Sequence, residues 1–194
     1  MKSNMRPADK LAPHRVENTI ADYLSSNGFA EIFSNSLTNP SYYEEDSQLV
    51  TMLNPLSRET EVLRGTMLYG GLETIAYNQN RKRKNLKLYE FGSTYQAIGN
   101  SNFEETKRLA LWLSGDVQEE NWQEGKASTD YFLLKEKIEN CLKRLGVSKW
   151  KSQKTEDSRF DSAIELVRGK STLAVMGRVS KSELKKIEVK EEVF

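Results

Sequence analysis

The residue types that most often carry out chemistry are sparse in this sequence. His14 is its one histidine, the type of side chain that titrates near neutral pH without a perturbed environment. The sequence contains no Gly-x-x-x-x-Gly-Lys-Ser/Thr loop, no Gly-x-Gly-x-x-Gly motif after a predicted strand, no nucleophile elbow and no Cys-x-x-Cys pair. Cys141 is the one cysteine, so neither an internal disulfide nor a structural zinc site is expected. We therefore predict no catalytic residue and no metal ligand.

Three glycines could be taken for a phosphate-binding loop. Gly65 precedes the pair Gly70 and Gly71, but their spacing differs from that of a phosphate loop. The pair also falls inside an apolar helical stripe that includes Leu68 and Leu72. Small residues in such a stripe allow close packing against a neighbouring element. The spacing favours packing, and phosphate binding is the alternative.

Glu90 is the most informative single residue, because its segment alternates between two faces. It shares a face with Leu86 and Leu88, which should draw its carboxylate into the protein. A buried carboxylate needs a partner or a raised pKa. Our hypothesis is a structural ion pair between Arg64 and Glu90 that fixes the preceding turn against the sheet. The alternative is a solvated carboxylate on the strand surface.

A run of four cations, Arg81, Lys82, Arg83 and Lys84, ends one predicted helix. Cations near a helix C-terminus are stabilised by the helix dipole. They could instead contact the phosphates of tRNA. No aromatic residues interleave the run and the protein is nearly neutral, which favours the helix-dipole interpretation.

Composition predicts one soluble domain that covers residues 1–194. The 29 basic and 28 acidic residues leave a formal net charge of +1, which gives no bulk attraction to nucleic acid or membrane. Mean hydropathy is −0.68, and no apolar run approaches the ~20 residues needed to span a bilayer. The N-terminus lacks the apolar segment of a secretory signal. A cytoplasmic location is therefore expected.

Hydrophobic periodicity predicts the elements that would position these residues. Helices are expected at residues 8–27, 66–81, 131–145 and 182–187. Strands are expected at residues 29–37, 49–53, 86–98, 104–114, 162–167 and 172–179. The stretch 109–113 is apolar at every position, so its strand should lie centrally and be covered on both faces. The order predicts an α+β fold, with an antiparallel β-sheet flanked by helices.

Several motifs occur together in an order that is typical of one family. An Asn-Pro-Leu-Ser turn at 54–57 leads into Leu-Arg at 63–64 and then into the helix with Gly70 and Gly71. Asn80 and Arg81 and a Leu-Tyr-Glu-Phe-Gly strand at 88–92 follow. Further matches lie at 121–123, 130–135, 176–179 and 184–186. The chain thus resembles, over nearly its whole length, the β subunit of bacterial phenylalanyl-tRNA synthetases.

This resemblance implies a core similar to that of class II aminoacyl-tRNA synthetases, in a copy without catalytic activity. Class II catalysis uses an arginine in a Phe-Arg-x-Glu motif and another in a Gly-x-Gly-x-x-x-Arg motif to hold the ATP phosphates. Arg64 lacks the glutamate of the first motif, and Arg178 follows only one glycine, Gly177. We therefore expect no cofactor in this domain, whereas the parent enzyme uses ATP and Mg²⁺.

The resemblance also implies partners. In the family, the cores of the α and β subunits associate through the first helix and the strand after it, and the (αβ)₂ enzyme ligates phenylalanine to tRNA(Phe). The corresponding interface positions are Leu11, Arg15, Thr19, Tyr23, Phe33 and Asn35. The editing, winged-helix and anticodon-binding domains of the family lie outside this stretch. We therefore expect a fragment whose sheet has an open edge at its C-terminal side.

Two other functions remain as alternatives. The chain could be a free-standing class II synthetase-like enzyme that forms an adenylate, although the missing arginine motifs oppose this. It could also be a tRNA-binding module that uses Arg81–Lys84, which would bind in a salt-dependent way.

Overall fold

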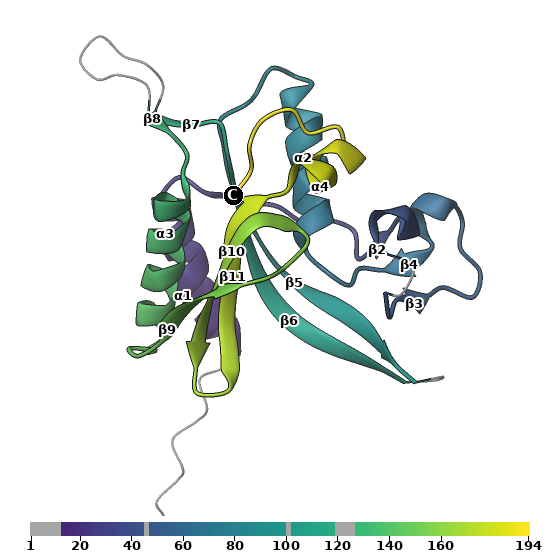
Figure 1. Cartoon of the computed structure of the whole chain (residues 1–194), viewed down its shortest axis with the longest axis horizontal. Coiled ribbons are helices and arrows are strands. Elements are labelled where there is room, and N and C mark those ends of the chain that lie inside the picture. Colours follow the sequence, from purple (N-terminus) through teal and green to yellow (C-terminus); the bar gives the residue numbers. More distant parts are fainter. Residues whose placement is uncertain (1–12, 45–46, 100–101, 119–126) are drawn as a thin grey trace, which may run out of the picture.

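The computed structural model describes residues 13–44, 47–99, 102–118 and 127–194 (Figure 1). Its elements are α1 (Pro13–Ser26), β1 (Ala30–Glu31), β2 (Leu37–Thr38), η1 (Pro40–Tyr42), β3 (Val50–Thr51), η2 (Arg58–Thr60), β4 (Val62–Leu63), α2 (Leu68–Gln79), β5 (Leu86–Ile98), β6 (Asn102–Ser114), β7 (Asp116–Gln118), β8 (Ala127–Ser128), α3 (Tyr131–Arg144), β9 (Lys151–Thr155), β10 (Phe160–Arg168), β11 (Ser171–Val179) and α4 (Lys181–Lys186).

The long antiparallel hairpin of β5 and β6 is the framework of the molecule. Its residues pair from Leu86 with Ser114 to Ile98 with Asn102 without a register shift. Alternation along the strands places Leu88 on the face covered by α2 and α4, and Tyr89 on the face covered by α1 and α3. Figure 1 shows these two helix pairs on either side of the strands. The prediction of a hairpin covered on both faces is therefore confirmed.

A second antiparallel sheet has the strand order β11-β10-β9, and the C-terminal residues connect it to the hairpin. Leu113 N donates to Phe194 O at 2.9 Å and Phe194 N donates to Leu113 O at 3.0 Å. Val179 N donates to Val193 O at 2.9 Å. Residues 193–194 thus lie between β6 and β11 and join the two sheets. The edge that we expected to be open is occupied at this end of β6.

The predicted helices form where local signals mark their ends. α1 stops at Ser26, and Gly28 then has a φ of +79°, the left-handed conformation that glycine adopts without strain. Asp130 caps α3 by accepting a hydrogen bond from Leu133 N at 2.8 Å. Ser180 has the same position before α4. Mixed helices and antiparallel strands confirm the α+β class.

Two of the predicted strands differ from the structure, and one observed strand was not predicted. The strand expected at 29–37 is wrong: β1 and β2 are short pieces at its two ends, and residues 32–36 between them lie outside regular strands. The strand expected at 49–53 is reduced to β3. β9 was not predicted, because its residues Lys-Ser-Gln-Lys-Thr are polar on both faces. Among the described strands it pairs with β10 alone, and a polar edge strand resists pairing with other chains.

Candidate functional site

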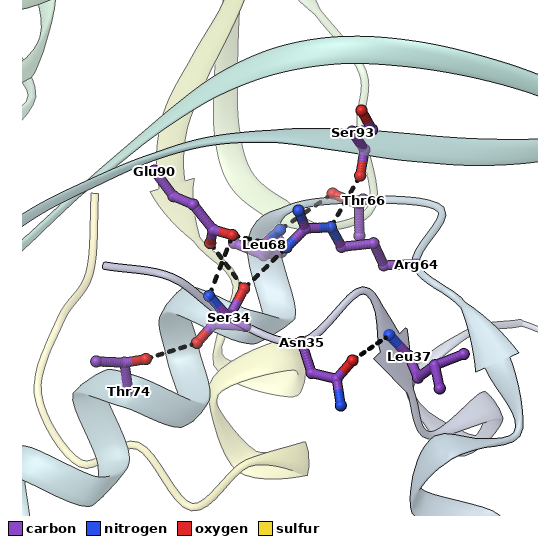
Figure 2. A network of polar contacts seen from close by, with 10 residues as sticks. Ser34, Asn35, Leu37, Arg64, Thr66, Leu68, Thr74, Glu90 and Ser93 are labelled. Carbon is purple, nitrogen blue, oxygen red and sulfur yellow. Dashed lines mark hydrogen bonds and ion pairs between the residues drawn. The ribbon is translucent and has the colours of Figure 1, made fainter. Parts of the chain in front are cut away.

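Three segments that are far apart in the sequence meet at a buried polar network (Figure 2). Arg64 follows β4, Ser34 lies in the segment 32–36 between β1 and β2, and Glu90 is in β5. Arg64 Nη1 lies 2.9 Å from Glu90 Oε1, and the side chains are 6% and 1% exposed. Arg64 and Glu90 thus form the hypothesised ion pair, and the alternative of a solvated carboxylate is wrong.

Ser34 is the third member of this network. Its hydroxyl donates to Glu90 Oε2 at 2.7 Å, and its main-chain N–H donates to Glu90 Oε1 at 3.2 Å. The same hydroxyl accepts a hydrogen bond from Arg64 Nη1 at 2.8 Å. Sequence reasoning missed Ser34 because it lies in the polar stretch Ser-Asn-Ser. No local signal could have identified it, because the sequence alone does not show that a carboxylate from β5 lies beside its hydroxyl.

Arg64 forms hydrogen bonds both to β5 and to the segment 32–36. Arg64 Nε donates to Ser93 O at 2.8 Å in β5. Its main-chain N–H donates to Ser36 O at 2.8 Å, and its carbonyl accepts from Tyr95 N at 2.9 Å. A buried ion pair is tolerated only when such additional bonds satisfy its remaining donors and acceptors. The polar groups at this site therefore hold one defined arrangement of three segments.

Arg64 also explains why the predicted strand 29–37 is interrupted. β1 pairs in parallel with β5, and Ile32 N donates to Tyr89 O at 2.8 Å. In the same register, a continued strand would bring Ser36 N to Ser93 O. That carbonyl instead accepts from Arg64 Nε. The buried guanidinium replaces the ladder, so the chain leaves β5 after Ile32.

Two glycines make room for the network. A Cβ atom at Gly92 would contact the Arg64 guanidinium, and a Cβ atom at Gly70 would contact the Ser34 hydroxyl. A Cβ atom at Gly71 would contact the ring of Trp112, so α2 packs directly on β6. Protein atoms fill the space beside Gly70 and Gly71, as the packing interpretation requires.

Five of the six positions expected at a subunit interface lie in the described part of the chain, and four of these five are exposed. Leu11 lies outside the described residues. Arg15 and Thr19 are exposed on α1, and Phe33 and Asn35 are exposed beside the network.

Tyr23 has to be removed from the predicted interface, because the residue is buried, with only 9% of its surface exposed. Its hydroxyl accepts from Asn140 Nδ2 at 3.1 Å, and the Arg144 guanidinium lies 4.3 Å from its ring centroid. Tyr23 belongs to the stripe of α1 that packs on α3, so it is not part of an accessible surface.

The basic run Arg81–Lys84 lies just after α2, whose last turn carries no basic residue. The predicted helix end at Arg81 therefore has to be corrected, but the run directly follows the C-cap Asn80 and so lies at the helix C-terminus, where the dipole favours cations. The Arg81 guanidinium lies 3.4 Å from the Tyr77 ring centroid and donates to Tyr77 O. Lys84 Nζ lies 2.6 Å from Glu191 Oε1. Two of the four charges thus have partners within the chain.

A cavity of about 360 Å³ lies where η1, the start of α2, the β9–β10 connection and α4 meet. Tyr42, Tyr43 and Tyr69 line it together with Arg159 and Lys186. Each of these cations is paired with a carboxylate: Arg159 with Asp157 at 2.5 Å, and Lys186 with Glu183 at 2.7 Å. The paired charges leave the cavity without the excess of positive charge that a nucleotide phosphate requires.

Two tyrosines of this cavity, Tyr42 and Tyr69, are held as neutral phenols. Burial, followed by a hydrogen bond to Glu183, raises the pKa of Tyr69. Burial, followed by a hydrogen bond to Glu73, raises the pKa of Tyr42 to about 12. Neither phenol can therefore act as a base near neutral pH.

The described residues contain neither a metal-binding cluster nor a membrane-spanning helix. Residues 13–44, 47–99, 102–118 and 127–194 contain no cluster of three or more histidine, cysteine, aspartate or glutamate side chains that could hold a metal ion. Within the same part of the chain, no helix has the length and apolar character needed to cross a membrane.

A protein-family comparison matches the whole sequence. The model of the family described as "Phenylalanyl tRNA synthetase beta chain CLM domain" matches residues 1–194. The phenylalanine–tRNA ligase beta subunit of Bacteroides fragilis is 34% identical over 93% of this chain and 24% of its own length. That of Porphyromonas gingivalis is 31% identical over the same shares. The chain thus spans about a quarter of the length of these curated relatives.

A comparison with solved structures supports the fold. The pyrrolysyl-tRNA synthetase of Desulfitobacterium hafniense superposes with a TM-score of 0.71, covering 93% of this chain and 63% of that chain at 16% identity. A second structure of this synthetase gives a TM-score of 0.69 at 18% identity. The chain therefore shares its fold with this synthetase.

Proposed function

Because this chain belongs to the family of the phenylalanyl-tRNA synthetase β-chain CLM domain, we propose that it is the structural core of a phenylalanyl-tRNA synthetase β subunit. In this proposal it assembles with a catalytic α subunit into an (αβ)₂ ligase that attaches phenylalanine to tRNA(Phe) with ATP. The family match over residues 1–194 is the observation that carries the proposal. A cytoplasmic location follows from such a role in translation.

The core is class II-like in this proposal, and it is catalytically inactive. An antiparallel sheet flanked by helices supports the class II assignment. Arg64 is buried in its ion pair with Glu90, and Arg178 lies 3.2 Å from both Asp161 and Glu192. Neither arginine is free to hold an ATP phosphate. ATP and Mg²⁺ would therefore be used by the α subunit.

The surface proposed for the α subunit combines the exposed face of α1 with the segment 32–36. Arg15 and Thr19 supply polar groups on the helix, and Phe33 supplies a side chain that is 96% exposed. A large apolar side chain left in water is typical of a protein interface, where aromatic residues often carry much of the binding energy. An inert copy of the fold would act as a scaffold, presenting a rigid surface to the active subunit.

Light scattering on a sizing column tests assembly, with the chain alone and after co-expression with the cognate α subunit. A stable mixed complex is expected, and Phe33→Ala should weaken it. Phe132→Ala is the matched control, since Phe132 is 74% exposed and is on α3, which supplies none of the residues of the proposed surface. Equal losses from the two variants, or no mixed complex, would contradict the proposal.

The alternative of an adenylate-forming enzyme would place its substrates in the tyrosine-lined cavity. Isothermal calorimetry with ATP and Mg²⁺ distinguishes the two functions. The scaffold proposal requires no binding heat, because both cations of the cavity are paired. Saturable ATP binding that is lost in Arg159→Ala would favour the enzyme.

The alternative of a tRNA-binding module rests on Arg81–Lys84. All four side chains are exposed, but the contacts of Arg81 and Lys84 within the chain reduce the available charge. Binding through this run would weaken steeply with salt, and neutralising the four charges would abolish the salt dependence. The scaffold proposal predicts tRNA binding that is unchanged by this neutralisation.

A further inference from the structure

We infer that Ser34 is a positioning residue, which fixes segment 32–36 so that the Phe33 side chain is presented to the partner subunit as a preorganised anchor. The inference rests on the proposed assembly with the α subunit. It adds a residue that the sequence did not identify and a physical reason why the buried network matters for binding.

Phe33 has no contacts of its own that would hold it in place. Its side chain is 96% exposed. Its main-chain N–H and C=O make no hydrogen bond to any other residue in the described part of the chain. The direction of this side chain is therefore decided by the residues on either side of it.

Those residues are held at three points, and Ser34 is the middle one. Before it, Ile32 N donates to Tyr89 O at 2.8 Å. After it, Ser36 O accepts from Arg64 N at 2.8 Å. Between them no β-ladder exists, and the three hydrogen bonds of Ser34 to Glu90 and Arg64 replace it. The Glu90 carboxylate accepts the Ser34 N–H where a strand would offer a carbonyl.

The inward position of Ser34 sets the outward position of its neighbours. Figure 2 shows Ser34 directed toward Glu90, while Asn35 points away from the network and bonds to Leu37 N. Because successive side chains of an extended segment alternate, Phe33 projects on the same side as Asn35. The Ser34 hydroxyl also packs against Gly70, which prevents the segment from moving toward α2.

A segment held in this way has little backbone conformational entropy to lose on binding. A loop whose backbone is already in the bound conformation binds more tightly than a mobile one. The partner that fits is a surface of the α subunit with an apolar pocket for Phe33. The unpaired N–H and C=O of Phe33 can bond to the rim of the same pocket.

The test compares Ser34→Ala with Ser36→Ala in this chain. Both variants remove one hydroxyl from the same segment, but the Ser36 side chain makes no hydrogen bond in the described structure. Amide hydrogen exchange of residues 32–37 reports how firmly the segment is held. The dissociation constant of the complex with the α subunit reports how the rigidity of the segment affects binding. If the binding-competent conformer falls to about a tenth of the population, the apparent constant rises about tenfold.

Ser34→Ala should accelerate exchange in residues 32–37 and weaken α-subunit binding about tenfold, while Ser36→Ala should match the wild type. A purely structural role would instead lower protection in β5 and the segment together and leave the affinity of the folded protein unchanged. Unchanged exchange in the segment, or unchanged affinity despite faster exchange, would overturn the inference.

A second variant guards against loss of folding. Ser34→Cys fills a similar space with a weaker hydrogen-bonding group, and it should show the same two changes to a smaller extent. If wild-type chain fails to bind the α subunit, the proposed function fails. The exchange data would still decide whether Ser34 fixes the segment, so the two failures can be distinguished.

Discussion

At the scale of single residues, the central feature is a charge pair that the protein has removed from water. Arg64 and Glu90 are held by Ser34, Ser93 and their own main chains, so each charge has several partners. Removing one member of such a pair leaves an uncompensated buried charge, which costs more than the pair contributes in itself. The site therefore stabilises the fold only when both charges and their hydrogen-bond partners are present.

Arg64→Ala and Glu90→Ala should each lower the free energy of unfolding by about 3–5 kcal/mol. The double variant should lose clearly less than the sum, because neither charge is left alone. Urea denaturation measures all three. Lys107→Ala is the control: it removes an exposed pair with Glu17 at 3.4 Å, and its loss should stay below about 1 kcal/mol. Strictly additive losses would disprove the coupling.

Cys141 gives a second prediction at this scale. Burial in the core between α1 and α3 raises the pKa of its thiol to about 11. The thiolate is the reactive form, and an unfolded cysteine has a pKa of about 8.5. Ellman's reagent at pH 8 should therefore react at least about 100-fold more slowly with the native chain than with the urea-unfolded chain. Similar rates would show that the thiol is accessible.

At the scale of elements, the connection between β9 and β10 links the second sheet to α2. Asp157 Oδ2 lies 2.5 Å from Arg159 Nη2, and Arg159 Nη1 donates to Thr66 Oγ1 at 3.0 Å. The hydrogen bond from Arg159 is the largest of the effects that lower the pKa of Asp157. The charged carboxylate therefore orients the arginine that joins the two elements.

The lowered pKa of Asp157 makes this contribution pH-dependent. Since the carboxylate is favoured in the folded state, its stabilisation is complete above the unfolded pKa of about 3.9 and is lost as pH falls through the lower folded value. Asp157→Asn should thus lower stability by a constant amount above about pH 5, and the difference should shrink below about pH 4. Thermal unfolding from pH 3 to 7 measures this. A constant difference across the range would contradict the linkage.

At the scale of the whole molecule, two sheets act as one layer because residues 193–194 lie between them. Val193 is fully buried, and its carbonyl accepts from Val179 N while Phe194 bonds to Leu113. The connection brings β11 beside the hairpin that carries Glu90. The network and the C-terminal residues are therefore parts of one continuous framework.

Val193→Ala should weaken this connection and lower the free energy of unfolding by about 1–3 kcal/mol. The loss should be accompanied by faster amide exchange at Leu113 and Val179, the two positions that bond to the C-terminal residues. Val175→Ala is the control, because this β11 side chain is 40% exposed and should cost much less. Equal costs would show that the two sheets are independent.

The sequence by itself determined the features that depend on residues close together in the chain, such as the alternation of a strand and the capping of a helix. The alternation along 86–98 and the continuous apolar run at 109–113 predicted the covered hairpin, and Asp130 marked the start of α3. The shared face of Glu90 with two leucines led to the hypothesis of a buried ion pair with Arg64, and the solvated carboxylate was its alternative. Together with the family motifs, these signals predicted the α+β class and a synthetase core.

Tertiary structure decided the rest, because the missing information lay in contacts between distant segments. The strand expected at 29–37 ends early since Arg64 takes the Ser93 carbonyl that a ladder would use. Tyr23 shares one apolar stripe with neighbours on α1, and only the packing of α3 shows that its ring is inside. β9 is polar and is a strand only because β10 pairs with it. Ser34 became visible once the fold brought a carboxylate from β5 to its hydroxyl, since a lone serine in a polar stretch carries no local signal of burial.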